Sequence, residues 1–239
     1  NLFKTYCLGD VVTEMEIDRR LSNFPVPDAV EKQWQTDLLI NARGVAVDME
    51  LVQGALEIDA AARDRLTKEA VEITGLDNPN SVSQLAKWLE QATETSVTDL
   101  RKDTVAQMLE SQAVTGSANR VLEIRQELGK TSTKKYNAIE AAVCGDGRVR
   151  GLLQFYGANR TGRWAGRLVQ VQNLPRTYIE QLDLARGAVR NKQGDKLRVL
   201  FGSVPDTLSQ LIRTSFIASP GNKLVDADFS AIEARVISW

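Results

Sequence analysis

The feature that most constrains the fold is a change in the spacing of apolar residues near residues 145–147. Before that point apolar side chains recur every three or four residues, which is the spacing of helices with one buried face. After it, short apolar runs alternate with loops that contain glycine and proline, which is typical of strands. The sequence therefore predicts a mixed α + α/β chain, with a helical half followed by a half that contains a β-sheet.

The helical half has recognisable start and stop signals. Asp48 is suited to cap the N-terminus of a long helix, and Gly75 is suited to the left-handed position at its end. A short extended segment at Val45 and Val47 precedes this helix. Helices are expected over residues 1–21, 28–41, 49–75, 81–89, 103–109 and 117–143.

Strands are expected in the second half over residues 149–155, 168–171 and 223–236. The last of these places Asp226 and Asp228 on one face, because strand residues two apart point the same way. Paired carboxylates at a strand end offer the hard oxygen ligands that Mg²⁺ prefers. Two such acids on a solvated strand end, with no metal, are the simpler alternative.

The charges of the two halves have opposite sign. Residues 1–116 carry 11 basic and 20 acidic side chains, whereas residues 117–239 carry 19 basic and 11 acidic ones. Residues 148–176 contain six arginines, three aromatic residues and no acid. This pattern predicts a surface that binds a polyanion, with a solvated basic face as the alternative.

Composition excludes several other classes. Only Cys7 and Cys144 are present and histidine is absent, so neither a disulfide framework nor a Cys/His zinc site is expected. No apolar run is long enough to cross a bilayer, and the N-terminus lacks a secretion signal. We therefore expect no membrane partner and a cytoplasmic location.

The last segment is the most informative. Residues 228–235 read Asp-Phe-Ser-Ala-Ile-Glu-Ala-Arg, which resembles motif A of the family A DNA polymerases, Asp-Tyr-Ser-Gln-Ile-Glu-Leu-Arg. Further resemblances follow the order of the family. Tyr6-Cys-Leu-Gly-Asp10 resembles the 3′→5′ exonuclease motif, and residues 130–136 resemble the end of the thumb. Thr161-Gly-Arg163 and Gln172-Asn173-Leu-Pro175 resemble palm elements, and residues 213–221 resemble the segment that leads into motif A.

This resemblance implies a domain plan for a right-hand polymerase. Residues 1–24 would be the last helix of an exonuclease domain, residues 25–146 the helical thumb, and residues 147–239 the first, incomplete part of the β-sheet palm, ending after motif A. Asp228 follows Pro175 by 53 positions, a longer interval than in the bacterial repair enzymes. That spacing favours the phage-type branch, for which the location would be the host cytoplasm.

The resemblance also implies a role for each matching catalytic residue. Asp228 would bind two Mg²⁺ ions, with the backbone carbonyl of Phe229 as a further ligand, for nucleotidyl transfer from a deoxynucleoside triphosphate to a primer 3′-hydroxyl. Glu233 would exclude a 2′-hydroxyl from the incoming nucleotide. Tyr6 and Asp10 would be the remnant of the exonuclease site.

The remaining matches imply contacts with primer-template DNA. Arg160, Arg163, Gln172 and Asn173 would lie along the backbone and minor groove near the primer end. Three lysines would hold duplex phosphates: Lys130, Lys134 and Lys135.

Several family elements have no counterpart in the sequence, namely the fingers helix, the second palm carboxylate and the Asp-x-Glu of the exonuclease. We therefore expect this chain to be inactive alone. The alternatives are a module that grips primer-template DNA without chemistry and a single-subunit RNA polymerase, which Glu233 disfavours. The sequence leaves replication accessory proteins open.

Overall fold

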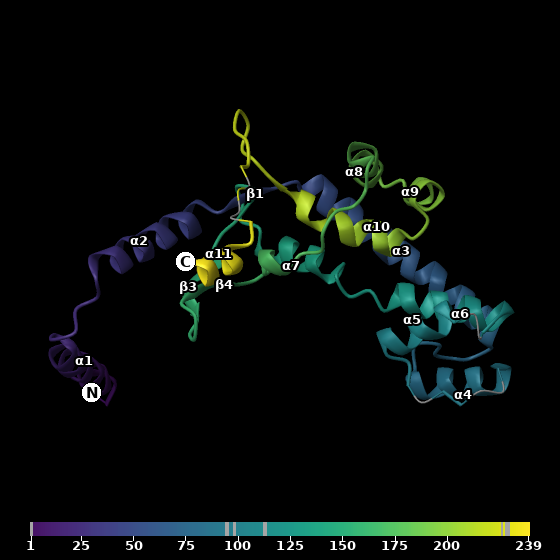
Figure 1. The fold of residues 1–239 in the computed structure, drawn as a ribbon, viewed down its shortest axis with the longest axis horizontal. Coiled ribbons are helices and arrows are strands. Elements are labelled where there is room, and N and C mark those ends of the chain that lie inside the picture. Colours follow the sequence, from purple (N-terminus) through teal and green to yellow (C-terminus); the bar gives the residue numbers. More distant parts are fainter. Residues whose placement is uncertain (1, 94–95, 98, 112–113, 226, 228–229) are drawn as a thin grey trace.

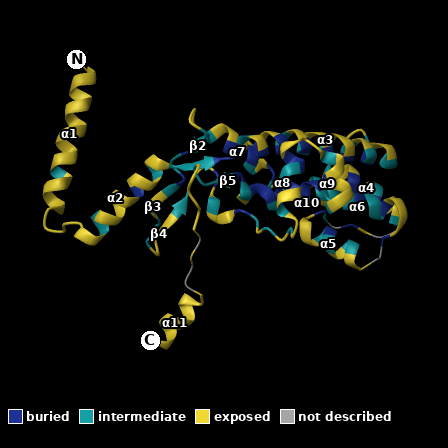
Figure 2. Ribbon diagram, turned by 90° about the horizontal axis from the view of Figure 1, so that it is seen from above, coloured by how far each residue is buried: buried dark blue, intermediate teal, exposed yellow. Residues whose placement is uncertain are grey.

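The protein is elongated, and helices at both ends flank small sheets near its middle (Figure 1). The structure, a computed structural model, describes residues 2–93, 96–97, 99–111, 114–225, 227 and 230–239. Helices α1 (Leu2–Leu21) and α2 (Asp28–Arg43) extend from one end, and α1 has no buried residue (Figure 2). At the other end, α4 (Val82–Thr93), α5 (Lys102–Glu110) and α6 (Gly116–Leu128) pack together.

Helix α3 (Met49–Thr74) connects the middle of the molecule to the far end and begins and ends as expected. The Asp48 side chain accepts a hydrogen bond from the Leu51 N–H at 3.1 Å, and Gly75 has a positive φ of 67°. Asp48 also accepts hydrogen bonds from two arginines of α8 (Leu182–Arg190), Arg186 at 3.3 Å and Arg190 at 2.9 Å. The cap thus also fixes α8 to the start of α3.

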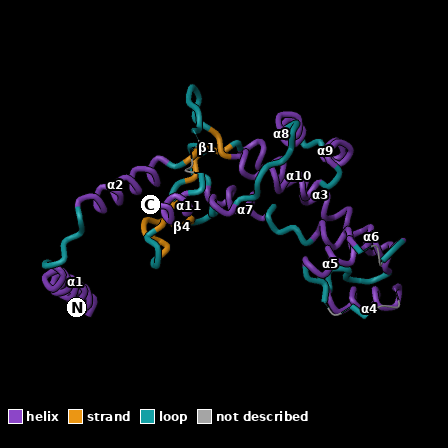
Figure 3. The backbone as a smooth tube through the Cα atoms, viewed as in Figure 1, coloured by secondary structure: helices purple, strands orange, loops and turns teal. Residues whose placement is uncertain are grey.

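Two small antiparallel sheets lie near the middle of the molecule, one at the start of α3 and the other against α2 (Figure 3). The first has the order β2 (Arg148–Val149), β1 (Val45–Val47), β5 (Phe216–Ile217), with Val45 opposite Val149 and Ala46 opposite Ile217. Gly44 has a positive φ, and a Cβ there would lie 2.4 Å from the Val149 carbonyl oxygen. The second sheet is a hairpin of β3 (Leu153–Ala158) and β4 (Arg163–Gly166).

The larger hydrophobic core joins segments that are far apart in the sequence. It contains residues of α3 together with α7 (Lys134–Ala142), α8, α9 (Gly194–Phe201) and α10 (Val204–Leu211). A separate cluster holds α4, α5 and α6 together. Elements on both sides of the predicted boundary near residue 146 therefore contribute to one packed core.

The expected helices over residues 1–21, 28–41, 49–75, 81–89 and 103–109 are present, the first of them as described from Leu2 onward. The expectation of one helix over residues 117–143 is wrong, because α6 ends at Leu128 and α7 begins at Lys134. Arg63 stabilises this break, since its guanidinium donates to the carbonyls of Leu128 and Lys130 at 3.0 and 2.7 Å.

Two expected strands are also absent from the described residues. Residues 168–171 form a turn that leads into a 3₁₀ helix (Val171–Asn173), and the positive φ values of Leu168 and Gln170 lie outside the extended range of a regular strand. Residues 223–225 form no strand, and Ile232–Ser238 form helix α11. A second 3₁₀ helix, Ile212–Ser215, precedes β5.

Candidate nucleic-acid interface

The β3–β4 hairpin carries the arginines that the sequence singles out. Arg160 and Arg163 are exposed at its turn, and neither side chain has a hydrogen bond or ion pair within the part of the chain that the structure describes. The ring of Tyr156 lies against the same turn, since a Cβ on Gly162 would be 2.8 Å from its Cζ. Two unpaired cations and a half-exposed aromatic ring therefore lie together at the hairpin end.

The amide side chains predicted to contact DNA lie next to this hairpin. Gln172 contacts β4 so closely that a Cβ on Gly166 would be 1.9 Å from its side-chain oxygen. Asn173 donates to the side-chain oxygen of Gln170 at 3.3 Å. Gln172 and Asn173 are exposed. The structure therefore brings Gln172 alongside the strand that begins with Arg163.

A polar clamp that sequence reasoning missed holds the hairpin on α2. The indole Nε1 of Trp164 donates to the Asp37 carboxylate at 2.8 Å, and Asn41 donates to the same carboxylate at 3.0 Å. Asn41 also exchanges two 3.0 Å hydrogen bonds with the backbone of Leu153. Asp37 is only 5% exposed, so this acid of α2 is a buried anchor.

The three lysines predicted to hold phosphates differ in whether their side chains already have a bonding partner. Lys134 is exposed and has no side-chain partner among the described residues. Lys130 forms an ion pair with Asp206, and Lys135 donates to the Val169 carbonyl at 2.6 Å. A phosphate contact by Lys130 or Lys135 would have to replace these bonds, whereas one by Lys134 would not.

Helix α10 forms a seam with the segment around α7. The Ser132 and Ser209 hydroxyls lie 2.7 Å apart, and the buried Tyr136 hydroxyl donates to the Leu208 carbonyl at 2.7 Å. Burial raises the pKa of Asp206, but hydrogen bonds from Lys130 and Gln210 outweigh it, so the pKa lies below its usual value. The seam thus fixes where Lys134 lies relative to the core.

The residues predicted for catalysis are only partly described. Asp226, Asp228 and Phe229 lie outside the described residues. Glu233 is exposed in the first turn of α11. In the described residues no group of three or more histidine, cysteine, aspartate or glutamate side chains could hold a metal ion. Tyr6 and Asp10 are exposed on α1.

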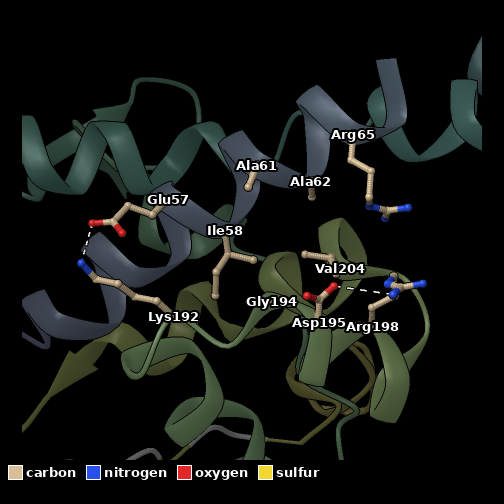
Figure 4. A pocket seen from close by; sticks show the side chains of 10 residues that line it. All are labelled: Glu57, Ile58, Ala61, Ala62, Arg65, Lys192, Gly194, Asp195, Arg198 and Val204. Carbon is tan, nitrogen blue, oxygen red and sulfur yellow. Dashed lines mark hydrogen bonds and ion pairs between the residues drawn. The ribbon is translucent and has the colours of Figure 1, made fainter. Parts of the chain in front are cut away.

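Two hollows away from the hairpin have charged linings. One of about 980 Å³ lies between α5 and the end of α6 and includes Arg101, Lys102, Arg125 and Lys130. The other, of about 340 Å³, lies between α3 and α9 (Figure 4). There Lys192 pairs with Glu57 at 2.7 Å, and Arg198 pairs with Asp195 at 3.5 Å. Because these cations already have partners, we interpret this hollow as part of the contact between α3 and α9.

Comparison with known proteins identifies the family. The model of the family "DNA polymerase family A" matches residues 57–239. The chain belongs to DNA polymerase family A. A DNA polymerase of Bacillus phage SP02 is 51% identical to this family A chain over 237 residues, which are 99% of the chain and 36% of that relative. The predicted family and its phage-type branch are thus confirmed.

This family A chain therefore spans about a third of the length of the phage relative that it matches. No solved structure matches it. Among the described residues, no helix is both long and apolar enough to cross a membrane.

Proposed function

We propose that this chain takes part in template-directed DNA synthesis, the transfer of a nucleotide from a deoxynucleoside triphosphate to a primer 3′-hydroxyl. The observation that carries the proposal is the acid-free surface of the hairpin, where Arg160, Arg163 and the neighbouring Gln172 are exposed. No aspartate or glutamate occurs from residue 147 to residue 179, so nothing in that segment repels a nucleic acid. Family membership and the motif A sequence supply the chemistry.

Primer-template DNA would lie against the hairpin and the adjoining 3₁₀ helix. Arg163, Gln172 and Asn173 would donate to minor-groove acceptors, which occur at similar positions in all base pairs. Lys134 would hold a duplex phosphate, and Lys130 and Lys135 would join it where their present bonds are exchanged. Such contacts bind DNA without reading its sequence.

The proposed division into an exonuclease helix (residues 1–24), thumb (25–146) and palm (147–239) assigns these contacts to two domains. The seam between α10 and α7 would hold the thumb phosphate contact at a fixed distance from the palm hairpin. Tyr6 and Asp10 would belong to a proofreading site.

The described residues do not form a metal site, so the proposed metal chemistry depends on Asp228. Its carboxylate is a hard oxygen ligand of the kind that suits Mg²⁺, and Phe229 would add a backbone carbonyl. Two Mg²⁺ ions in such a site supply activation of the 3′-hydroxyl and neutralisation of the triphosphate. Glu233 would act at the sugar, where its side chain leaves no room for a 2′-hydroxyl.

The test is binding of primer-template duplex across a salt series. Arg163→Ala should weaken binding roughly tenfold. Lys134→Ala should make the negative slope of log K against log salt less steep by about 0.9, because one phosphate contact is lost. Arg198→Ala is the matched control, since Arg198 pairs with Asp195 on a distant helix. Equal affinities for all four proteins would refute the proposed interface.

A further inference from the structure

An apolar hollow opens between α2 and β3 that none of the roles above uses. It has a volume of about 450 Å³ and is lined by Val26, Val30, Glu31, Trp34, Phe155 and Tyr156. Trp34 is 45% exposed and Tyr156 is 53% exposed. Aromatic rings from two elements thus border one open space, which we call the aromatic hollow.

The aromatic hollow adjoins the cationic end of the hairpin. Tyr156, which lines it, is the same ring that lies against Gly162, and Gly162 lies between Arg160 and Arg163 in the turn. Both arginines are exposed, and across the described residues neither has a partner. The aromatic hollow therefore lies next to the turn that carries two guanidinium groups without partners among the described residues.

The walls of the aromatic hollow are held in place from behind. The Phe155 ring packs edge-on against Trp164 with centroids 5.3 Å apart, and it lies 5.6 Å from the Tyr156 ring. The Trp164 indole N–H donates a hydrogen bond to the buried Asp37 of α2. Because α2 also carries Trp34, the clamp fixes the two walls relative to each other before any ligand binds.

We propose that the aromatic hollow binds an unpaired base of single-stranded DNA, with Trp34 and Tyr156 as stacking surfaces and Arg160 and Arg163 as phosphate contacts. Stacking on aromatic rings beside a basic track is how proteins hold single strands without sequence preference. The inference rests on the proposed function, because a polymerase meets unpaired bases at a frayed primer end or in the template strand.

The small size of the site favours a base over a protein segment. Six lining residues are far fewer than the roughly 20 to 30 that each partner contributes to a stable protein interface. Glu31 is the one acid in the lining, and it accepts a hydrogen bond from Gln35 at 3.0 Å. Its negative charge repels a phosphate backbone. Removing that charge therefore tests the charge of the ligand directly.

The experiment measures binding of a fluorescently labelled oligo(dT) to the 239-residue chain. Trp34→Ala and Tyr156→Ala should each weaken binding roughly 5- to 100-fold, which is the loss expected for one stacked base. Trp34→Phe should retain most of the affinity, because an aromatic face remains. Tyr178→Ala, which removes an exposed tyrosine outside the hollow, should change nothing.

Glu31→Gln identifies the charge of the occupant. It should tighten oligo(dT) binding about 2- to 5-fold at low salt and have no effect at high salt, because exposed charges are then screened. A weaker affinity in this variant would mean that Glu31 attracts the ligand, and would overturn the proposal. So would self-association of the chain that disappears with Trp34→Ala while oligo(dT) affinity stays unchanged.

Duplex binding separates this inference from the proposed function. If Arg163→Ala weakens duplex binding while Trp34→Ala and Tyr156→Ala leave oligo(dT) binding intact, the inference fails and the proposed function stands. If neither Arg163→Ala nor Lys134→Ala weakens duplex binding, the proposed function fails. Circular dichroism of each variant checks that it is folded. Substitutions of half-exposed side chains should not disturb the fold.

Discussion

At the scale of single residues, Asp48 combines a local and a long-range role. It caps α3 through the Leu51 N–H, and the same carboxylate accepts from Arg186 and Arg190 on α8. Burial raises the pKa of Asp48, but these hydrogen bonds lower it by more, so the pKa lies below its usual value of 3.8. The charged form is therefore the one that stabilises the fold.

We predict that Asp48→Asn lowers the free energy of unfolding at pH 7 by about 2 kcal/mol, because the amide keeps a cap but loses charge-assisted bonds to two arginines. The difference from the wild type should persist above pH 3.8 and disappear as the pH falls through the lowered pKa of the folded protein. Urea unfolding at several pH values measures it. Asp195→Asn, at an exposed ion pair, is the control, and a deficit that does not depend on pH would contradict the charge argument.

The residues that sequence reasoning placed correctly are those whose role is local. Asp48 as a cap and Gly75 as a helix end depend on the next few residues, and both are confirmed. The partners of Asp37 and Lys130 lie 127 and 76 positions away, so no pattern near either residue indicates them. Asp37 does interrupt an apolar series in α2, and that was the one available signal that its carboxylate is buried.

At the scale of elements, the close approach of α3 and α8 depends on a residue without a side chain. A Cβ on Gly54 would lie 2.1 Å from the Val189 carbonyl oxygen, which is backbone and cannot rotate away. Gly187 on α8 has open space around its Cβ position. The same change, glycine to alanine, therefore tests packing at one position and helix propensity at the other.

We predict that Gly54→Ala destabilises the protein by about 1 to 3 kcal/mol, the usual cost of forcing atoms into a packed contact. Gly187→Ala should instead stabilise it by roughly 0.5 to 1 kcal/mol, because glycine within a helix is less favourable than alanine. Thermal unfolding of both variants decides between these signs. A Gly54→Ala variant that is more stable than the wild type would show that α3 and α8 are farther apart than in the structure.

The elements that sequence analysis missed are short and depend on tertiary contacts. Helices α8, α9 and α10 have eight or nine residues each, too few to be stable in isolation, and they form by packing on α3 and on one another. The break between α6 and α7 depends on Arg63, which is distant in sequence. The long helix α3 was predictable because its 26 residues carry their own periodicity and both end signals.

At the scale of the whole molecule, the described residues form two larger hydrophobic clusters and one small cluster, and the small cluster is built from α3 and α6. Leu89 is fully buried in the cluster of α4, α5 and α6, and Leu208 is fully buried in the larger core. A small cluster of Leu66, Ala70 and Ile124 lies between them. The hairpin that carries Arg163 is on the side of the larger core, so the far end should be able to open without disturbing it.

We predict that Leu89→Ala and Leu208→Ala each cost about 2 to 5 kcal/mol, but in different parts of the molecule. Leu89→Ala should raise amide hydrogen exchange in α4 and α5 while α7, α8 and α10 stay protected, because local openings follow cooperative packing units. Leu208→Ala should raise exchange in α7, α8 and α10, and in the first sheet. Exchange that rises uniformly along the chain in both variants would mean one cooperative unit, in which case the α4–α6 end could not move independently of the β3–β4 hairpin.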